Sequence, residues 1–202
     1  MQVVRYVMVV AAGYLLGSFP TGYLAARLFK GVDPRRHGSG RTGGTNILRT
    51  AGKGAALLTI TGDLLKGFLA VWVARSWLGT QTSMVLTGLA AVVGHNRSIF
   101  LRFRGGAGSM TNAGAMLGLA PHVVPFMAVA AVISARVTRM GSVTSIAAAA
   151  TMVIGLVVSY FLSLTPLSYV LYGVLACALI LLELKPNLQR LSKGTERRVE
   201  DY

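Results

Sequence analysis

The chain has 202 residues, of which 53% are hydrophobic and only 13% are charged, and its mean hydropathy is +0.61. Soluble domains carry about 25% charged residues, so this composition excludes an ordinary soluble domain and indicates a membrane protein. Twenty Lys and Arg residues against 6 acidic ones give a net charge of +14, but no nucleic-acid-binding module accompanies them, so anionic lipid or substrate is predicted and nucleic acid is not.

Seven apolar segments predict seven transmembrane helices, because a helix of roughly 20 apolar residues spans the hydrocarbon core. The segments are 4–26, 55–77, 84–93 continuing toward 103, 111–121, 122–135, 143–164 and 167–184. The fourth and fifth are short, and short helices at membrane depth must pack against protein or line a cavity. We therefore expect an all-α, polytopic integral membrane protein with a single membrane domain over residues 1–202.

The basic residues between the apolar segments predict the orientation. With the N-terminus outside, the cytoplasmic segments are 27–54, 94–107 and 136–142 and the tail 185–202, which together hold 17 of the 20 Lys and Arg residues. Such an excess marks cytoplasmic loops. We therefore expect an outside N-terminus and a cytoplasmic C-terminus.

Two of the cytoplasmic segments combine glycine, hydroxyl and guanidinium groups: RRHGSGRTGGTNILR (35–49) and GHNRSIFLRFRGGAGSMTNAG (94–114). Glycine lets backbone amides approach a ligand and form an anion-binding nest, helped where a helix follows. One such cluster would be explained by a flexible loop whose arginines only set topology. Two favour a phosphate-bearing ligand at the cytoplasmic face. Neither is a Walker A loop, because neither ends in Gly-Lys-Ser/Thr.

Other polar residues lie in or near these segments. Asp63 and Lys66, three residues apart within an apolar segment, are expected to form a structural pair facing the bundle interior. His37 and His95 border the glycine clusters as candidate ligands, bases or helix-end hydrogen-bonding groups. No paired His or Cys spacing predicts a metal site, and Cys177, the single cysteine, excludes a disulfide within the chain.

Four stretches, in order, resemble the acyl-phosphate-dependent glycerol-3-phosphate acyltransferases of bacteria. They are GSFPTGYLAARLFKGVDPRRHGSGRTGGTNILRTAGKGAALLT (17–59), DLLKG (63–67), GHNRSIFLRFRGGAGSMT (94–111) and NLQRLSKGTE (187–196). The resemblance implies a seven-span enzyme of the bacterial inner membrane whose active site faces the cytoplasm. It implies transfer of a fatty acyl group from acyl phosphate to the 1-hydroxyl of glycerol 3-phosphate, which gives lysophosphatidate for phospholipid synthesis, with no cofactor.

The same resemblance places site residues in this chain. The segment TRMGSVTSI (138–146) looks like the family's loop before its sixth helix, and the third motif also supplies Gly194 and Glu196. The candidate catalytic residues are His95, Ser142 and Asn187. The candidate substrate-binding residues are Ser39, Gly40, Asn46, Arg49, Gly105, Gly106, Gly108, Thr111 and Arg190, to which Arg41 and Arg104 are added as cations outside the family's pattern.

The chain departs from the family's motifs at three positions. Arg41 stands where the family has asparagine, Ala107 where it has a lysine that helps bind phosphate, and Leu184 where it has a histidine. Arg41 lies two positions after Ser39, and its guanidinium offers a bidentate fork where lysine offers a point charge. We therefore expect Arg41 to compensate for the missing lysine, with Arg102 and Arg104 as further candidates.

The mechanism favoured by the sequence is direct transfer without an acyl-enzyme, because no Ser-His-Asp set can be drawn. A substrate phosphate oxygen is the favoured base, ahead of His37 or His95. Two other functions stay open. A catalytically altered paralogue that binds a lysophospholipid or another phosphate-bearing ligand would fit Ala107 and Leu184, and a small anion transporter is disfavoured by the lack of an internal repeat. If the chain is an acyltransferase, we expect one basic pocket to be surrounded by segments 35–49, 94–108, 139–142 and 187–196.

Overall fold

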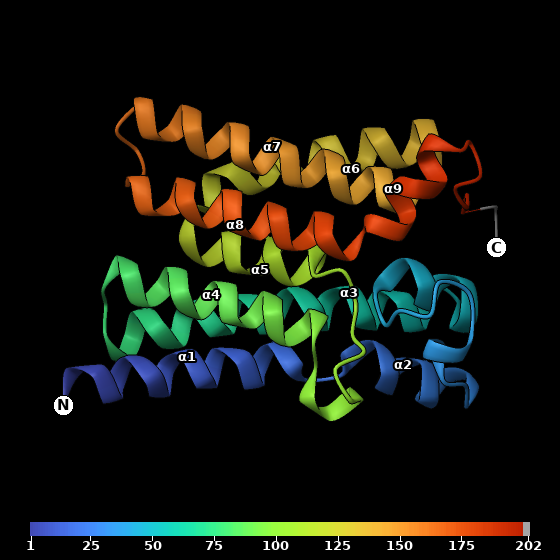
Figure 1. Ribbon diagram of the computed structural model, residues 1–202, viewed down its shortest axis with the longest axis horizontal. Helices are drawn as coiled ribbons and strands as arrows, with labels where there is room; N and C mark the ends of the chain where they lie inside the picture. Colours follow the sequence, from blue (N-terminus) through green and yellow to red (C-terminus); the bar gives the residue numbers. More distant parts are fainter. Residues whose placement is uncertain (200–202) are drawn as a thin grey trace.

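The computed structural model describes residues 1–199, which form helices and loops without any β-strand. The helices are α1 (Gln2–Ser18), α2 (Thr21–Lys30), η1 (Pro34–Arg36), α3 (Gly44–Trp77), α4 (Gln81–Asn96), η2 (Ile99–Leu101), α5 (Ser109–Leu119), η3 (Pro121–Val123), α6 (Val124–Thr138), α7 (Gly141–Phe161), α8 (Leu167–Glu183) and α9 (Lys185–Ser192). Figure 1 shows the long helices side by side along one axis. The predicted all-α class is confirmed.

Five stretches of the described chain are long and apolar enough to cross a membrane: Gln2–Lys30, Gly44–Trp77, Gln81–Leu101, Pro121–Thr138 and Gly141–Phe161. A sixth candidate is the pair Leu167–Glu183 and Lys185–Ser192, which is bent by 66° at its break. The remaining predicted segment, 111–121, falls on α5, whose 11 residues are too few to cross alone. Membrane-spanning helices are thus confirmed, while the count of seven and the orientation stay predictions.

Close contact with α3 holds the short helix α5 in the bundle. A Cβ atom on Gly67 would lie 1.9 Å from the carbonyl oxygen of Thr111, and one on Gly114 would lie 1.8 Å from that of Leu64. Only glycine fits at either position, and small residues let membrane helices approach closely. Helix α5 also contacts α4, α6, α7 and α8. It is therefore enclosed by protein, as expected for a short helix at membrane depth.

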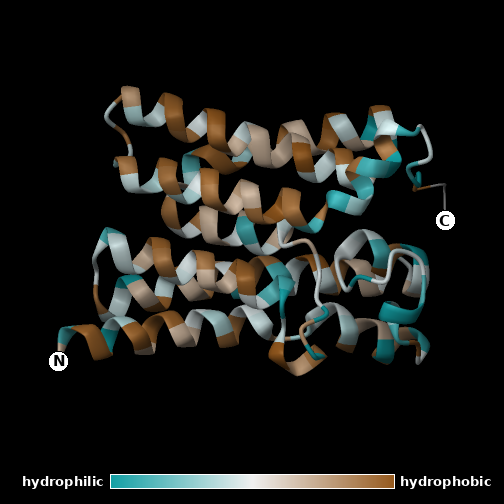
Figure 2. Cartoon of the chain, viewed as in Figure 1, coloured by the Kyte–Doolittle hydropathy of each residue, from teal (hydrophilic) through white to brown (hydrophobic). Residues whose placement is uncertain are grey.

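The outer faces of the long helices are apolar. Large side chains such as Trp72, Phe126 and Ile154 are more than half exposed, at 53%, 66% and 64%. Such a surface is unfavourable in water but suits a helix surrounded by lipid. Hydrophilic residues gather at the end of the bundle that holds η1, α9 and the ends of α2 and α6 (Figure 2). The bundle thus presents an apolar belt and one strongly polar end.

Candidate functional site at the polar end

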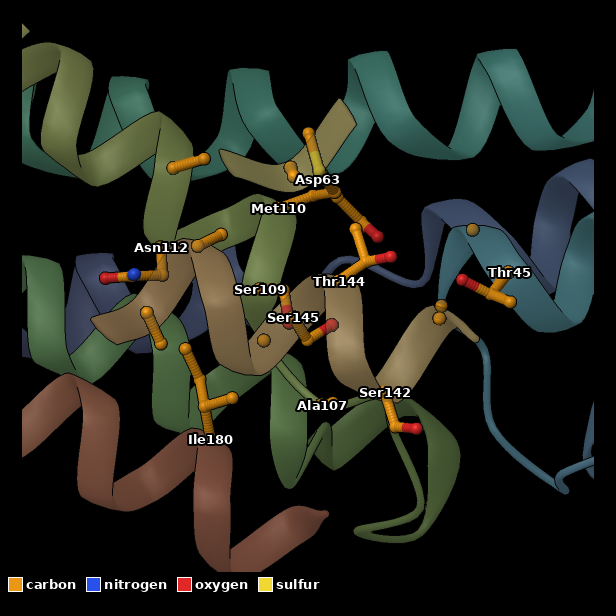
Figure 3. Close-up of a pocket in the computed structure, with 18 of the residues that line it drawn as sticks. Thr45, Asp63, Ala107, Ser109, Met110, Asn112, Ser142, Thr144, Ser145 and Ile180 are labelled. Atoms are coloured by element: carbon orange, nitrogen blue, oxygen red, sulfur yellow. The ribbon is translucent and has the colours of Figure 1, made fainter. Parts of the chain in front are cut away.

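A cavity of about 450 Å³ opens at this polar end. All four segments predicted to cluster contribute to its lining, represented by Ser39, His95, Ser142 and Asn187. The cavity continues between α6 and α7, where its lining includes the apolar residues Met127, Ala128, Ala131, Val132, Ala148 and Ala149. Figure 3 shows side chains from α3, α5, α7 and α8 around it. The predicted clustering is confirmed, but the pocket is not strongly basic, because Asp63 and Glu196 line it beside Arg41 and Arg49. The pocket joins a polar end to an apolar one.

Three helices begin at this cavity. The first residues of α3 (Gly44 and Thr45), of α5 (Ser109) and of α7 (Gly141 and Ser142) all line it. No side chain caps any of these three N-termini, so their first amide groups have no partner within the helix. Free amides and the positive ends of three helix dipoles make the polar end favourable for an anion.

Four amides of the glycine loops are used within the protein and do not take part in the predicted anion-binding nests. The amides of Ser39 and Gly40 donate to Asn46 Oδ1 and His37 O at 2.8 and 3.0 Å. Those of Gly105 and Gly106 donate to Asn96 O and His95 O, both at 3.2 Å. These amides are used within the protein because a polar backbone near the membrane must be satisfied internally. The amides left for an anion are those at the helix starts, which include Gly44 of the first cluster and Ser109 of the second.

Asn46, a predicted substrate-binding residue, serves chiefly to hold the first loop together. Its Oδ1 accepts the Ser39 amide, and its Nδ2 donates to Pro34 O, His37 O and Arg41 O at 3.0, 3.2 and 2.7 Å. The side chain borders the cavity but is only 2% exposed. With its amide fully engaged, Asn46 shapes the loop that presents Ser39 and Arg41.

His95 holds the second loop in a similar way. Its Nδ1 lies 3.4 Å from Asp63 Oδ1, and a Cβ on Gly106 would come within 2.2 Å of its Nε2. Nδ1 therefore faces Asp63, and Nε2 lies beside Gly106 on a residue that lines the cavity. A Cβ on Gly105 would meet His95 O at 1.8 Å, which explains the glycine pair. The contact with Asp63 thus gives His95 a positioning role.

Asp63 is a cavity residue whose role sequence reasoning missed. The expected pair with Lys66 is confirmed, with Nζ and Oδ1 2.8 Å apart. Asp63 also accepts a hydrogen bond from Thr21 Oγ1 and faces His95, so it joins α2, α3 and α4. It is 2% exposed and lines the cavity. The spacing of Asp63 and Lys66 indicated their pair, but nothing local in the sequence indicates His95 as a third partner.

Glu196 organises the C-terminal side of the cavity. Its Oε1 accepts from Ser142 Oγ at 2.9 Å and from Asn187 Nδ2 at 2.7 Å, and its Oε2 accepts from Arg190 Nε at 2.9 Å. Burial of the carboxyl disfavours its charge, but hydrogen bonds from Asn187, Ser142 and Arg190 outweigh this effect, so the pKa of Glu196 lies below its ordinary value. Two candidate catalytic side chains, those of Ser142 and Asn187, are thereby held in place by one carboxylate.

The segment that carries Glu196 lies across the polar end of the cavity. Arg197 Nη1 donates to Gly38 O at 2.5 Å, and the amide of Val199 donates to Arg139 O at 2.6 Å. Arg49 Nη2 donates to Arg197 O at 3.3 Å. Residues 194–199 therefore connect the first loop, the start of α3 and the turn before α7.

The guanidinium groups predicted to bind phosphate are divided between two places. Arg41 and Arg49 line the cavity, and Arg41 donates to Asn187 Oδ1 at 2.7 Å and to Glu183 O. Arg104 does not line it and is exposed on a second cavity. Five further predicted residues also lie outside the lining: Gly40, Gly105, Gly106 and Arg190, which support the loops and Glu196, and Thr111.

The hydroxyl groups at the start of α5 complete the polar end. The Oγ of Ser109, which sequence reasoning did not single out, is buried without a hydrogen-bond partner among the described residues and lies on a residue that lines the cavity. Thr111 Oγ1 is likewise buried and unpartnered, although Thr111 lies behind the lining. Gly108 lines the cavity with a φ of 85°, a left-handed backbone that favours glycine. The sequence carries no signal that ranks Ser109 above its neighbours.

Two of the departures from the family's motifs are neighbours in space. Leu184 is buried in an apolar cluster with Ala149 and Ile180, and Ala107 packs against the same cluster. Ala107, Ile180 and Leu184 also line the cavity. Replacing a lysine at one position and a histidine at the other with apolar residues therefore leaves no lone polar group in this cluster.

Comparison with known proteins places the chain. Residues 7–194 match the family described as glycerol-3-phosphate acyltransferase. A protein of that name from Rubrobacter xylanophilus is 44% identical over 192 residues, which cover 95% of this chain and 94% of the relative. One from Gloeobacter violaceus is 42% identical over 197 residues, covering 95% of this chain and 93% of the relative. The chain belongs to the glycerol-3-phosphate acyltransferase family.

Solved structures agree with this assignment. The glycerol 3-phosphate form of PlsY (YgiH), an integral membrane glycerol 3-phosphate acyltransferase, matches with a TM-score of 0.88, 33% identity and 96% coverage of both chains. Its lysophosphatidic acid form matches with a TM-score of 0.86 and 32% identity, covering 96% of this chain and 95% of the other. The resemblance drawn from the motifs is therefore confirmed.

The hydrogen bonds to Glu196 predict a pH dependence for the C-terminal segment. Folding lowers the pKa of Glu196. The stability that its carboxylate contributes is therefore complete above the unfolded-chain pKa of about 4.3 and is lost as pH falls through the lower folded pKa. Amide hydrogen exchange of residues 194–199, corrected for intrinsic rates, should show protection at about pH 6 that disappears toward about pH 3. In Glu196→Gln, protection should be weak throughout. A wild-type segment equally protected at both pH values would contradict this role.

Proposed function

We propose that this protein transfers a fatty acyl group from acyl phosphate to the 1-hydroxyl of glycerol 3-phosphate and so produces lysophosphatidate. The supporting observation is a single cavity with an anion-favouring polar end and an apolar end between α6 and α7. A lysophosphatidate molecule has the same division into a phosphate head and a hydrocarbon tail. Family membership and the two PlsY structures, one in a glycerol 3-phosphate form and one in a lysophosphatidic acid form, support the same reaction.

The polar end accounts for how two phosphate groups are brought together. Both substrates are anionic, and their repulsion must be offset before the hydroxyl reaches the acyl carbon. Arg41 and Arg49 supply positive charge, and the starts of α3, α5 and α7 supply amides and helix dipoles. Charges held in place before the reaction cost no reorganisation in the transition state.

The chemistry follows as a direct transfer. The 1-hydroxyl oxygen forms a bond to the acyl carbon, the bond from that carbon to the phosphate oxygen breaks, and inorganic phosphate leaves. We assign the hydroxyl proton to a substrate phosphate oxygen, ahead of His95, whose Nδ1 faces Asp63. Ser142 and Asn187, held by Glu196, are the polar side chains proposed to orient the reacting groups.

The same proposal includes the membrane and the side on which the reaction occurs. The cavity's polar end is built from the segments that carry most of the 20 Lys and Arg residues. Positive charge of this kind marks the cytoplasmic side. We therefore assign the protein to the bacterial inner membrane, with the polar end of the cavity and the C-terminus in the cytoplasm.

An assay of acyl donors tests the proposed reaction. Purified protein should acylate glycerol 3-phosphate with acyl phosphate and show no turnover with acyl-CoA or acyl carrier protein at equal concentration. Arg136→Gln, which alters an exposed cation outside the cavity, should behave as wild type. Turnover with acyl-CoA alone would overturn the proposed donor. Retained lysophospholipid without turnover by any donor would support a catalytically altered paralogue instead.

Arg49 provides a second test. If its guanidinium contacts a substrate phosphate, Arg49→Ala should lower kcat/KM by about 10²-fold, or roughly 2.7 kcal/mol of transition-state stabilisation. The variant should keep the thermal stability of the wild type within a few degrees. Arg136→Ala removes a charge from the same end of the bundle and serves as the matched control. Equal rates for the two variants would exclude a role for Arg49 in phosphate binding and leave it the structural contact with Arg197 O.

Arg41 and Ala107 provide a test of compensation. Arg41→Asn should nearly abolish acyl transfer, because it removes the cation nearest Asn187. Adding Ala107→Lys should recover much of the rate if one cation replaces the other. All four members of the double-mutant cycle must be measured, since recovery is a coupling between neighbouring positions. Additive losses would show that the two departures do not compensate.

A further inference from the structure

A second cavity, of about 600 Å³, is formed by the same two loops. Its lining residues are Tyr23, Asp33, Arg35, Arg36, Phe100, Leu101, Arg102 and Arg104, none of which lines the first cavity. Arg35 Nη1 donates to Leu101 O at 3.2 Å and so connects the two loops at this place. On the first loop, the residues that line the second cavity precede Ser39. On the second loop, they lie between His95 and Ala107, both of which line the first cavity.

The second cavity has an excess of positive charge. Its lining contains four arginines and a single carboxylate, that of Asp33. Arg35 already occupies this carboxylate, with Nε 3.0 Å from Oδ1 and Nη2 2.7 Å from Oδ2. Hydrogen bonds from Arg35 lower the pKa of Asp33 to about 2, so the carboxylate stays charged. Within residues 1–199, no carboxylate pairs with Arg36, Arg102 or Arg104.

The backbone that presents two of these arginines is strained. Arg102 and Phe103 both have left-handed backbones, with φ of 54° and 61°. Such conformations are uncommon for residues other than glycine and persist only where their surroundings impose them. Here the amides of Phe103 and Arg104 donate to Ser98 O and Leu101 O at 2.8 and 3.2 Å. The tight turn places Arg102 and Arg104 on the same cavity.

Apolar side chains surround the basic groups. Ile99, Phe100 and Phe103 are 50%, 58% and 57% exposed, and Phe100 itself lines the cavity. The Arg35 guanidinium lies over the Tyr23 ring, 5.1 Å from its centre. Exposed apolar side chains would contribute nothing to the binding of a small soluble anion. Guanidinium groups beside apolar and aromatic side chains are instead typical of a surface that contacts both lipid head groups and acyl chains.

We propose that the second cavity binds the phosphate head group of an anionic phospholipid. Arg36, Arg102 and Arg104 contact the phosphate through charge-assisted hydrogen bonds, for which the guanidinium fork is well suited. Ile99, Phe100 and Phe103 lie against the acyl chains. The site is separate from acyl transfer, because it shares no lining residue with the first cavity. Its failure in an experiment would leave the proposed reaction untouched.

Native mass spectrometry of delipidated protein in a neutral detergent tests this site. The probes are phosphatidylglycerol, phosphatidylcholine with matched acyl chains, and inorganic phosphate. The variant Arg36→Gln/Arg102→Gln removes two cations from the cavity. The control Arg136→Gln/Lys193→Gln removes two exposed cations that line neither cavity. Size-exclusion profiles establish that both variants fold, and Arg36→Gln alone replaces the double variant if that one does not.

Wild-type protein should bind phosphatidylglycerol at least about tenfold more tightly than phosphatidylcholine, and the cavity variant should lose about tenfold or more of this affinity. The control variant should stay within about threefold of wild type. Equal losses in the two variants would overturn the site, since general surface charge would then explain the binding. Displacement of phosphatidylglycerol by an equal concentration of inorganic phosphate would overturn the assignment to a lipid and indicate a soluble anion.

Discussion

Polar groups at membrane depth must find partners within the protein, and this constraint shapes the whole polar end of the bundle. Asp63 meets it most clearly. A buried carboxylate is costly unless it is paired and hydrogen-bonded, and this one has partners on α2, on its own helix and on α4. Lys66 in turn donates to Phe19 O at 3.0 Å, in the break between α1 and α2. The Asp63 network thus joins the break between α1 and α2 to the end of α4, where the second glycine loop begins.

The same constraint explains why several amides of the glycine-rich loops donate to the protein. Asn46 and the carbonyls of His95 and Asn96 take up those amides and give each loop a fixed shape. The loops then bring the starts of α3, α5 and α7 to one cavity, where amides at the helix ends have no partner within their helices. The enclosed position of α5 is essential to this arrangement, and it depends on backbone contact at Gly67 and Gly114.

Much of this arrangement could be predicted from the sequence. Apolar runs predicted the helices, and the placement of charge predicted that four segments converge. Apolar runs and charge placement can both be read locally in the sequence, because each reflects how residues are solvated. The direction of single side chains in the loops could not be predicted in this way. Arg41 and Arg104 belong to motifs of similar composition, yet Arg41 reaches Asn187 and Arg104 faces the second cavity. The direction of such side chains depends on loop backbone angles and on partners far away in the sequence. His95, for example, is oriented by Asp63.

The arginines are divided between two cavities, and setting the membrane orientation does not by itself explain this division. Orientation in the membrane requires only that basic residues lie on one side. It does not require that Arg41 and Arg49 line one cavity while Arg36, Arg102 and Arg104 gather at another formed by the same loops. The contact of Arg35 with Leu101 O, and that of the Thr42 amide with Gly105 O at 3.4 Å, join the loops between the two sites. The two cavities are thus built on the same pair of loops, although they share no lining residue.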